Sequence, residues 1–155
     1  VMTLILALDA IADGNADLDD LVTTSAAAAN VGGSQMAPPL VEGEVQTLET
    51  LLYGLMVNSG NDAALAIAEH IGGSQADFAA MMNARAAQLG MSDTVYCQAA
   101  GGCFSTPADQ VALWRSAYTD PDFLRYVGPV DYQACGEGPS GEEICRFIER
   151  GPSVY

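Results

Sequence analysis

Three helical segments follow one another almost without interruption between residues 47 and 90, which restricts the chain to folds in which helices pack against helices. Thr47 is placed to cap the first segment, which runs to Met56. Asp62–Ile71 and Gln75–Leu89 are predicted as the second and third helices, and Gly90 is typical of a helix end. The first expectation is therefore a core built from closely connected helices.

The remaining segments add further helices and few strands. Ser25 can cap the short alanine run that follows it, and Pro107 suits the first turn of a helix. Further helices are predicted at residues 1–12, at 106–118 and from Asp120 onward, whereas strand candidates are found only at 21–24 and 94–97.

The chain of 155 residues is long enough for one domain with a sizeable core. From Gly128 onward it becomes rich in Gly, Glu and Pro, which predicts an irregular, exposed excursion. We therefore expect a single partial α+β domain over residues 1–155, with a helical lobe at 1–127. Residues 128–155 would lead towards sheet strands that this stretch lacks.

Charge excludes several kinds of partner. Twenty acidic residues stand against five basic ones, for a net charge of −15. Such a chain repels phosphate backbones and anionic membrane surfaces, which argues against nucleic acid as a partner. The chain also contains no apolar segment long enough to span a bilayer. All five basic residues are arginines and His70 is the one histidine, so a lysine base, a Schiff base or a histidine pair cannot come from this chain.

Four cysteines carry information about redox environment. None belongs to a C-x-x-C pair, so zinc or thioredoxin-like chemistry has little support. The short spacings fit two local disulfides, Cys97–Cys103 and Cys135–Cys145, although four cysteines allow three connectivities in all. Paired cysteines would imply an oxidising compartment. The alternative is four buried free thiols.

The most informative motif is Ser59-Gly60-Asn61, which separates two predicted helices. A hydroxyl and a carboxamide two residues apart on a tight glycine turn can point into one cleft, where they can relay a proton and hold a peptide carbonyl. The tripeptide alone is more typical of a helix–helix turn in which Ser59 or Asn61 caps the next helix.

The surrounding sequence favours the catalytic interpretation. The run from Thr47 to Ala64 resembles the second-motif region of the serine-type D-alanyl-D-alanine carboxypeptidases, which are low-molecular-mass penicillin-binding proteins related to β-lactamases. The similarity keeps its order along the chain and covers roughly residues 1–127. It includes Asp19–Ser25, Gly32–Ser34, the F-x-x-x-M-N-x-x-A-x-x-L-G-M pattern of Phe78–Met91, and Ser105–Asp109.

This resemblance implies a β-lactamase-like α+β fold and a site made of three elements, S-x-x-K, S-x-N and a K-T-G-like strand. Ser59 and Asn61 would supply the second. Val1-Met2-Thr3-Leu4 either occupies the first element with both catalytic residues lost, or directly follows its lysine. The second alignment keeps Asp9 and Gly14 in register and is preferred. The K-T-G strand would then lie beyond Tyr155.

The function implied is part of a carboxypeptidase that trims D-Ala-D-Ala stem peptides of peptidoglycan outside the cytoplasm through an acyl-enzyme. Ser59 would assist proton transfer and Asn61 would position the substrate amide. The complete protein would bind stem peptides and β-lactams and would need no cofactor or metal, while the isolated chain is expected to be inactive. The alternative is a non-catalytic domain on the same scaffold, either wall-associated or stabilised by calcium.

A calcium loop is the main rival site. Asp13–Asp20 presents alternating oxygen ligands, but Leu18 stands where such a loop needs glycine and Thr24 where it needs glutamate. A solvated turn is the simpler interpretation. His70 has no evident partner and is interpreted as structural.

Two expectations concern packing. Met81, Met82 and Trp114 have helical spacing and are assigned to the core rather than to a binding surface. Since the sheet-forming ends are missing from this stretch, residues 1–12 are expected to leave apolar area exposed along their helix.

Overall fold

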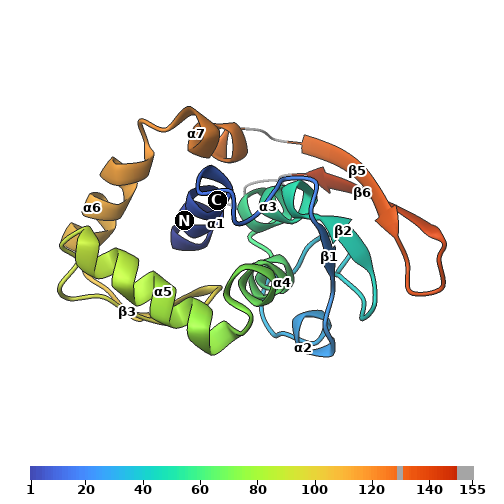
Figure 1. Ribbon diagram of the computed structural model, residues 1–155, viewed down its shortest axis with the longest axis horizontal. Coiled ribbons are helices and arrows are strands. Elements are labelled where there is room, and N and C mark those ends of the chain that lie inside the picture. Colours follow the sequence, from blue (N-terminus) through green and yellow to red (C-terminus); the bar gives the residue numbers. More distant parts are fainter. Residues whose placement is uncertain (129–130, 150–155) are drawn as a thin grey trace, which may run out of the picture.

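The computed structural model describes residues 1–128 and 131–149 (Figure 1). Within these residues the helices are α1 (Met2–Ala12), α2 (Ala26–Ala29), α3 (Leu48–Val57), α4 (Asn61–Gly72), α5 (Gln75–Gln88), α6 (Pro107–Ala117) and α7 (Pro121–Val127). The strands are β1 (Leu21–Thr23), β2 (Val45–Thr47), β3 (Val95–Gln98), β4 (Gly101–Phe104), β5 (Asp131–Glu137) and β6 (Glu143–Glu149).

Helix α1 lies in the middle of the helical part, in contact with α3, α4, α5 and α7 (Figure 1). Met2 and each residue of 4–7 are at most 7% exposed. The expectation that this helix would expose apolar area is therefore wrong for residues 2–7, which the neighbouring helices cover, whereas Leu8 and Ile11 are only partly buried and Ala12 is exposed. The other helical expectations are confirmed for α3 to α7, with ends that differ by a few residues.

Side-chain caps explain where the helices begin. The Ser25 hydroxyl accepts a hydrogen bond from the Ala28 N–H at 3.0 Å, and the Thr47 hydroxyl accepts one from the Thr50 N–H at 3.2 Å. Each bond satisfies one of the N–H groups that an α-helix leaves without a partner in its first turn. Both caps predicted from the sequence are confirmed.

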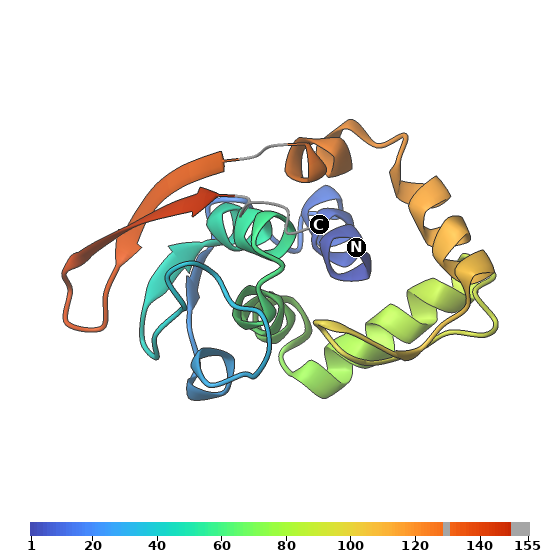
Figure 2. The same cartoon turned by 180° about the vertical axis from the view of Figure 1, so that it is seen from behind.

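A four-stranded antiparallel sheet lies beside α3 in the order β1-β2-β5-β6. Val45 of β2 pairs with Glu137 of β5, and the long β5–β6 hairpin extends away from the helices (Figure 2). The expectation of an irregular excursion over 128–155 is therefore wrong for residues 131–149. Residues 150–155 lie outside the described part of the chain.

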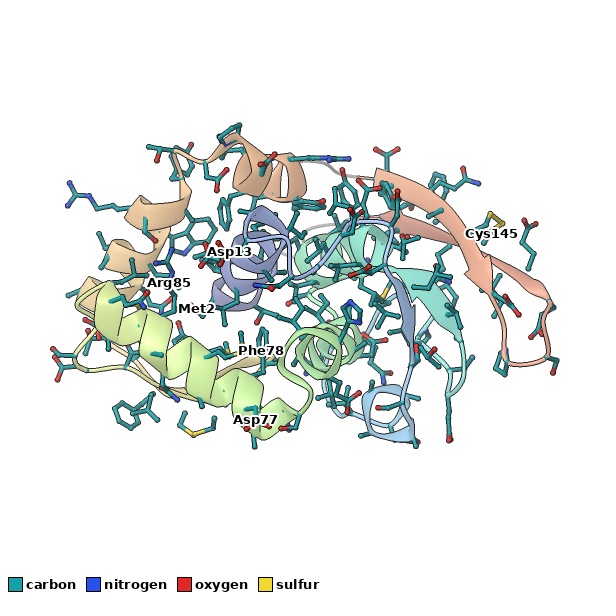
Figure 3. All side chains as sticks on the ribbon, in the orientation of Figure 1. Met2, Asp13, Asp77, Phe78, Arg85 and Cys145 are labelled. Carbon is teal, nitrogen blue, oxygen red and sulfur yellow. A yellow bond between two sulfur atoms is a disulfide. The ribbon has the colours of Figure 1, made fainter. Side chains whose placement is uncertain are left out.

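Both predicted disulfides are confirmed. Cys97–Cys103 joins β3 to β4, a strand that was not among the sequence candidates. Cys135–Cys145 joins two residues that face each other across the β5–β6 hairpin. Figure 3 shows Cys145 on this hairpin, on the opposite side of the molecule from Arg85 of α5.

Of the three residues assigned to the core from their helical spacing, Met82 is buried, and Met81 and Trp114 are not. Met82 is 1% exposed, as expected, whereas Met81 of α5 and Trp114 of α6 are 37% and 40% exposed. Helical spacing alone did not distinguish the buried from the partly exposed apolar residues. None of the helices in the described residues is long and apolar enough to cross a membrane.

Candidate functional site

Ser59 occupies the turn between α3 and α4, as the motif predicted. Its backbone φ is +57°, which makes it the one non-glycine residue with a positive φ among the described residues. Such a left-handed conformation is uncommon for a serine and is typical of sites where geometry is imposed by the surroundings. The side chain is exposed at the end of the turn, while the two helices pack against each other behind it.

Gly60 has a steric role in this turn. Its backbone is not left-handed, but a Cβ at this position would lie 2.8 Å from Oδ1 of Asp62 and 3.1 Å from Cγ of Met36. Only glycine fits without a shift of these neighbours. The sharpness of the turn therefore comes from Ser59, whereas the sequence had suggested that glycine provides it.

The loop of residues 32–34 holds Asn61 from the outside. The Asn61 N–H donates to the Ser34 carbonyl at 2.7 Å, and its side-chain Nδ2 donates to the Gly32 carbonyl at 2.8 Å. The Ser34 hydroxyl in turn donates to the Asn58 carbonyl at 3.0 Å. The Asn61 carboxamide is thereby fixed in one orientation, with one of its two side-chain N–H groups used by the protein.

Asp62 anchors the turn from the inside. This carboxylate is 0% exposed and accepts hydrogen bonds from the Met36 N–H, at 2.9 and 3.1 Å to its two oxygens, and from the Leu40 N–H at 3.0 Å. Hydrogen bonds to a charged acceptor are among the stronger ones in proteins. Ser59 and Asn61 therefore sit on a turn that is tied to the loop of residues 36–40.

A cavity of about 330 Å³ opens beside Ser59 and Asn61. Its other walls come from residues 1–3, from the turn at residues 99–101 between β3 and β4, and from Gln110 of α6. The Thr3 hydroxyl donates to the Ala99 carbonyl at 2.5 Å, which joins two of these walls. None of the described lining residues carries a charged side chain.

The phenol of Tyr96 also lines this cavity, and burial is the main reason why its pKa is raised. A hydrogen bond from Gln110 acts in the opposite direction and the Asp109 carboxylate adds to the increase. Tyr96 is therefore neutral at neutral pH. The site offers a hydroxyl, a carboxamide and a phenol in a polar but uncharged setting, and none of these groups is a base strong enough to activate a serine nucleophile.

In the candidate calcium loop of residues 13–20, the carboxylates of Asp17 and Asp20 bind other groups of the protein. Asp20 accepts from the Asp17 N–H at 2.9 Å and lies 3.0 Å from Nε2 of His70, and Asp17 accepts from the Asp19 N–H at 3.0 Å. The Asp17 N–H and His70 lower the pKa of Asp20. The solvated-turn interpretation accounts for these carboxylates. His70 does have a partner in Asp20, which its sequence context did not reveal because the two residues are far apart in the chain.

One further cluster could suggest a metal site. Cys135, Glu143 and Cys145 bring their ligand atoms within 4.8 Å of one another. The two sulfurs are bonded to each other in a disulfide, and a metal ligand would have to be a free thiolate. The cluster therefore does not form a thiolate metal site.

A family model described as D-alanyl-D-alanine carboxypeptidase matches residues 1–118, which include the turn and all the residues that line the cavity. The chain belongs to this family. The DacF D-alanyl-D-alanine carboxypeptidase of Bacillus subtilis is 33% identical over 132 residues, covering 83% of this chain and 33% of DacF. The D-alanyl-D-alanine carboxypeptidase of Streptomyces sp. K15 is 34% identical over 136 residues, covering 80% of this chain and 47% of that protein.

Solved structures show the same fold. Penicillin-binding protein 6B of Escherichia coli superposes with a TM-score of 0.80 at 28% identity, covering 99% of this chain and 48% of that one. A variant of the Streptomyces K15 DD-transpeptidase superposes with a TM-score of 0.83 at 27% identity, covering 99% of this chain and 64% of that one. The predicted α+β, DD-peptidase-like fold is confirmed. The chain spans about a third to a half of the curated relatives described above.

Proposed function

We propose that the parent protein is a serine-type D-alanyl-D-alanine carboxypeptidase that acts on peptidoglycan stem peptides and is acylated by β-lactams. The observation that carries this proposal is the Ser59–Asn61 turn, in which Ser59 has a left-handed backbone, at the edge of a cavity in a chain of this family. Two disulfides support a location outside the cytoplasm.

The nucleophilic serine and its lysine would come from an S-x-x-K element just before Val1. Val1 lines the same cavity as Ser59, so residues joined directly before it would lie close to that cavity. The nucleophile would attack the carbonyl of the penultimate D-alanine while the lysine takes its proton. The C–N bond to the terminal D-alanine then breaks, and its nitrogen takes up a proton before water hydrolyses the acyl-enzyme.

Ser59 and Asn61 have distinct parts in this scheme. The exposed Ser59 hydroxyl can pass the proton from the lysine to the departing nitrogen, because a hydroxyl both donates and accepts. One of the two N–H groups of Asn61 Nδ2 donates to the Gly32 carbonyl, so the second N–H and Oδ1 remain available to hold the substrate amide. Neither residue alone forms an acyl bond, and the 155-residue chain, which has no lysine, is expected to be inactive.

The test is labelling by fluorescent penicillin on a denaturing gel. The 155-residue chain should remain unlabelled, and the parent protein, with its upstream and downstream sequence, should take the label. In the parent, Ser59→Ala and Asn61→Ala should slow acylation by roughly a hundredfold or more, the usual scale for loss of one proton-transfer or polarising group.

The exposed residues Ser92 and Asn15 provide matched controls, since Ser92→Ala and Asn15→Ala should label like the wild type. A labelled band from the 155-residue chain would contradict the proposed division of roles. If the sequence upstream of Val1 contains no serine and lysine three residues apart, the non-catalytic wall-associated alternative replaces the catalytic one.

A further inference from the structure

A buried ion pair links the β5–β6 hairpin to the loop behind the candidate site. Arg146 of β6 is 1% exposed and Glu44 is 0% exposed. Nε and Nη2 of Arg146 each donate to one oxygen of the Glu44 carboxylate, both at 2.6 Å. Glu44 also accepts from Gln46 Nε2 at 2.8 Å and from the Val41 N–H at 3.1 Å. This pair is fully satisfied, which is the condition under which two buried charges are tolerated.

Buried ion pairs often contribute little to stability compared with apolar residues of the same volume. The Arg146–Glu44 pair is therefore better explained by the groups that it holds in position. The remaining donors of the Arg146 guanidinium bind backbone carbonyls of the neighbouring loop. Nη1 donates to the Pro38 carbonyl and Nη2 donates to the Pro39 carbonyl at 3.1 Å. One side chain from β6 therefore holds residues 38, 39 and 44, which lie within a single loop.

That loop carries the groups that hold the inner side of the turn. The N–H groups of Met36 and Leu40 bind the buried Asp62 carboxylate, which follows Asn61 directly. The Met36 side chain also fills the space against Gly60, where a Cβ would lie 3.1 Å from its Cγ. A displacement of the loop would therefore be passed on to the Ser59–Asn61 turn through packing and through hydrogen bonds to a charged group.

A second link joins β6 to the other end of the turn. Nδ2 of Asn58, the residue before Ser59, donates to the Glu149 carbonyl at 2.8 Å. Oδ1 of the same side chain accepts from the Ala37 N–H at 3.3 Å. The residues on both sides of the Ser59–Asn61 turn are thus connected to β6, one directly through Asn58 and one through Arg146 and the loop.

We propose that Arg146 and Asn58 are positioning residues, which hold the Ser59–Asn61 turn in its reactive geometry from strand β6. The inference rests on the proposed function, because it assigns these residues to the same acylation reaction. Catalytic groups must be held to within about 0.5 Å of the productive geometry, and misplacement of about 1 Å can slow a reaction by about a hundredfold. Arg146 touches neither the cavity nor Ser59, so its effect must pass through the loop.

The test uses the parent protein and compares variants that are folded by circular dichroism at 25 °C. Arg146→Met leaves Glu44 charged and unpaired, which can prevent folding, so the decisive variant combines Arg146→Met with Glu44→Leu and removes both charges. Asn58→Ala probes the second link. Arg146→Lys keeps the charge but loses the planar fork that reaches two oxygens of Glu44 and two carbonyls.

Each folded variant should be acylated by penicillin at least about tenfold more slowly than the wild type. With a peptide substrate, kcat should fall while KM changes less than about threefold, because the loss affects the transition state rather than binding. The exposed Arg115 supplies the control, and Arg115→Met should react like the wild type. Loss of stability alone would not alter the rate per folded molecule.

The outcomes separate the two proposals. A wild-type parent protein that is never labelled would overturn the proposed function. A labelled wild type, together with a folded double variant and a folded Asn58→Ala variant that both react within threefold of it, would overturn the positioning role while leaving the proposed function intact.

Discussion

The buried carboxylate of Asp62 allows a quantitative prediction. Asp62→Ala removes the acceptor for the N–H groups of Met36 and Leu40, and both groups lie too deep for water to replace it. A hydrogen bond to a charged group contributes about 1.5–3 kcal/mol, so two of them predict a loss of about 3–6 kcal/mol in the free energy of unfolding. At about 2–4 °C per kcal/mol, the melting temperature should fall by at least about 6 °C.

Thermal unfolding followed by circular dichroism measures this loss, and Asp77→Ala is the matched control. Asp77 also lies in the first turn of a helix, α5, but it is exposed, and its carboxylate accepts from the Ser74 hydroxyl. Its removal should cost less than about 1 kcal/mol, the range of a surface carboxylate at a helix N-terminus. Equal effects of the two substitutions would refute the assignment of Asp62 as the anchor of the 36–40 loop.

Three further predictions follow from other contacts. Replacing Cys135 and Cys145 by serine should lower stability by about 2–3 kcal/mol, as expected for a closed loop of this length, and equal melting of oxidised and reduced protein would contradict it. Burial raises the pKa of Glu44, but hydrogen bonds from Arg146 and others outweigh it and the net pKa is lowered. This stability is therefore present above the unfolded pKa of about 4.5 and lost as pH falls through the folded value, so urea titrations should show a smaller acid loss for Glu44→Gln than for the wild type. Thr3→Val leaves a buried carbonyl without its donor and should cost about 1–3 kcal/mol in thermal unfolding; no loss would argue against that bond.

The features of the fold that could be predicted from the sequence are those that depend on residues close together in the chain. Helix caps at Ser25 and Thr47 depend on neighbours three residues away, and the Cys97–Cys103 disulfide closes a short loop. Ser59 was placed on its turn for the same reason, since a break between two apolar helices is visible in the sequence. Each of these features leaves a signal within a few residues of sequence, although the geometry of the Ser59 turn also depends on the distant loops that bind Asn61 and Asp62.

The strands of the β5–β6 hairpin were not predicted because the residues of β6 do not follow the usual alternation of apolar inward and polar outward positions. In β6 the inward positions are Ile144, Arg146 and Ile148, whereas Phe147 points outward and is 51% exposed. An arginine among inward positions and a phenylalanine among outward ones reverse the alternation expected of a strand. The arginine is inside because Glu44 lies opposite it, and a partner so distant in sequence cannot be inferred from spacing.

The enclosure of α1 has a consequence for biosynthesis. Ribosomes make proteins from the N-terminal end, so this apolar helix leaves the ribosome long before the segments that cover it. Thr3 meets Ala99 across 96 positions of sequence, and α7, which also covers α1, ends at Val127. Until the chain has been made as far as Val127, the strongly apolar α1 is without its final neighbours and is prone to associate with other chains. Newly made protein would therefore benefit from rapid synthesis of these segments or from a chaperone that shields residues 1–12.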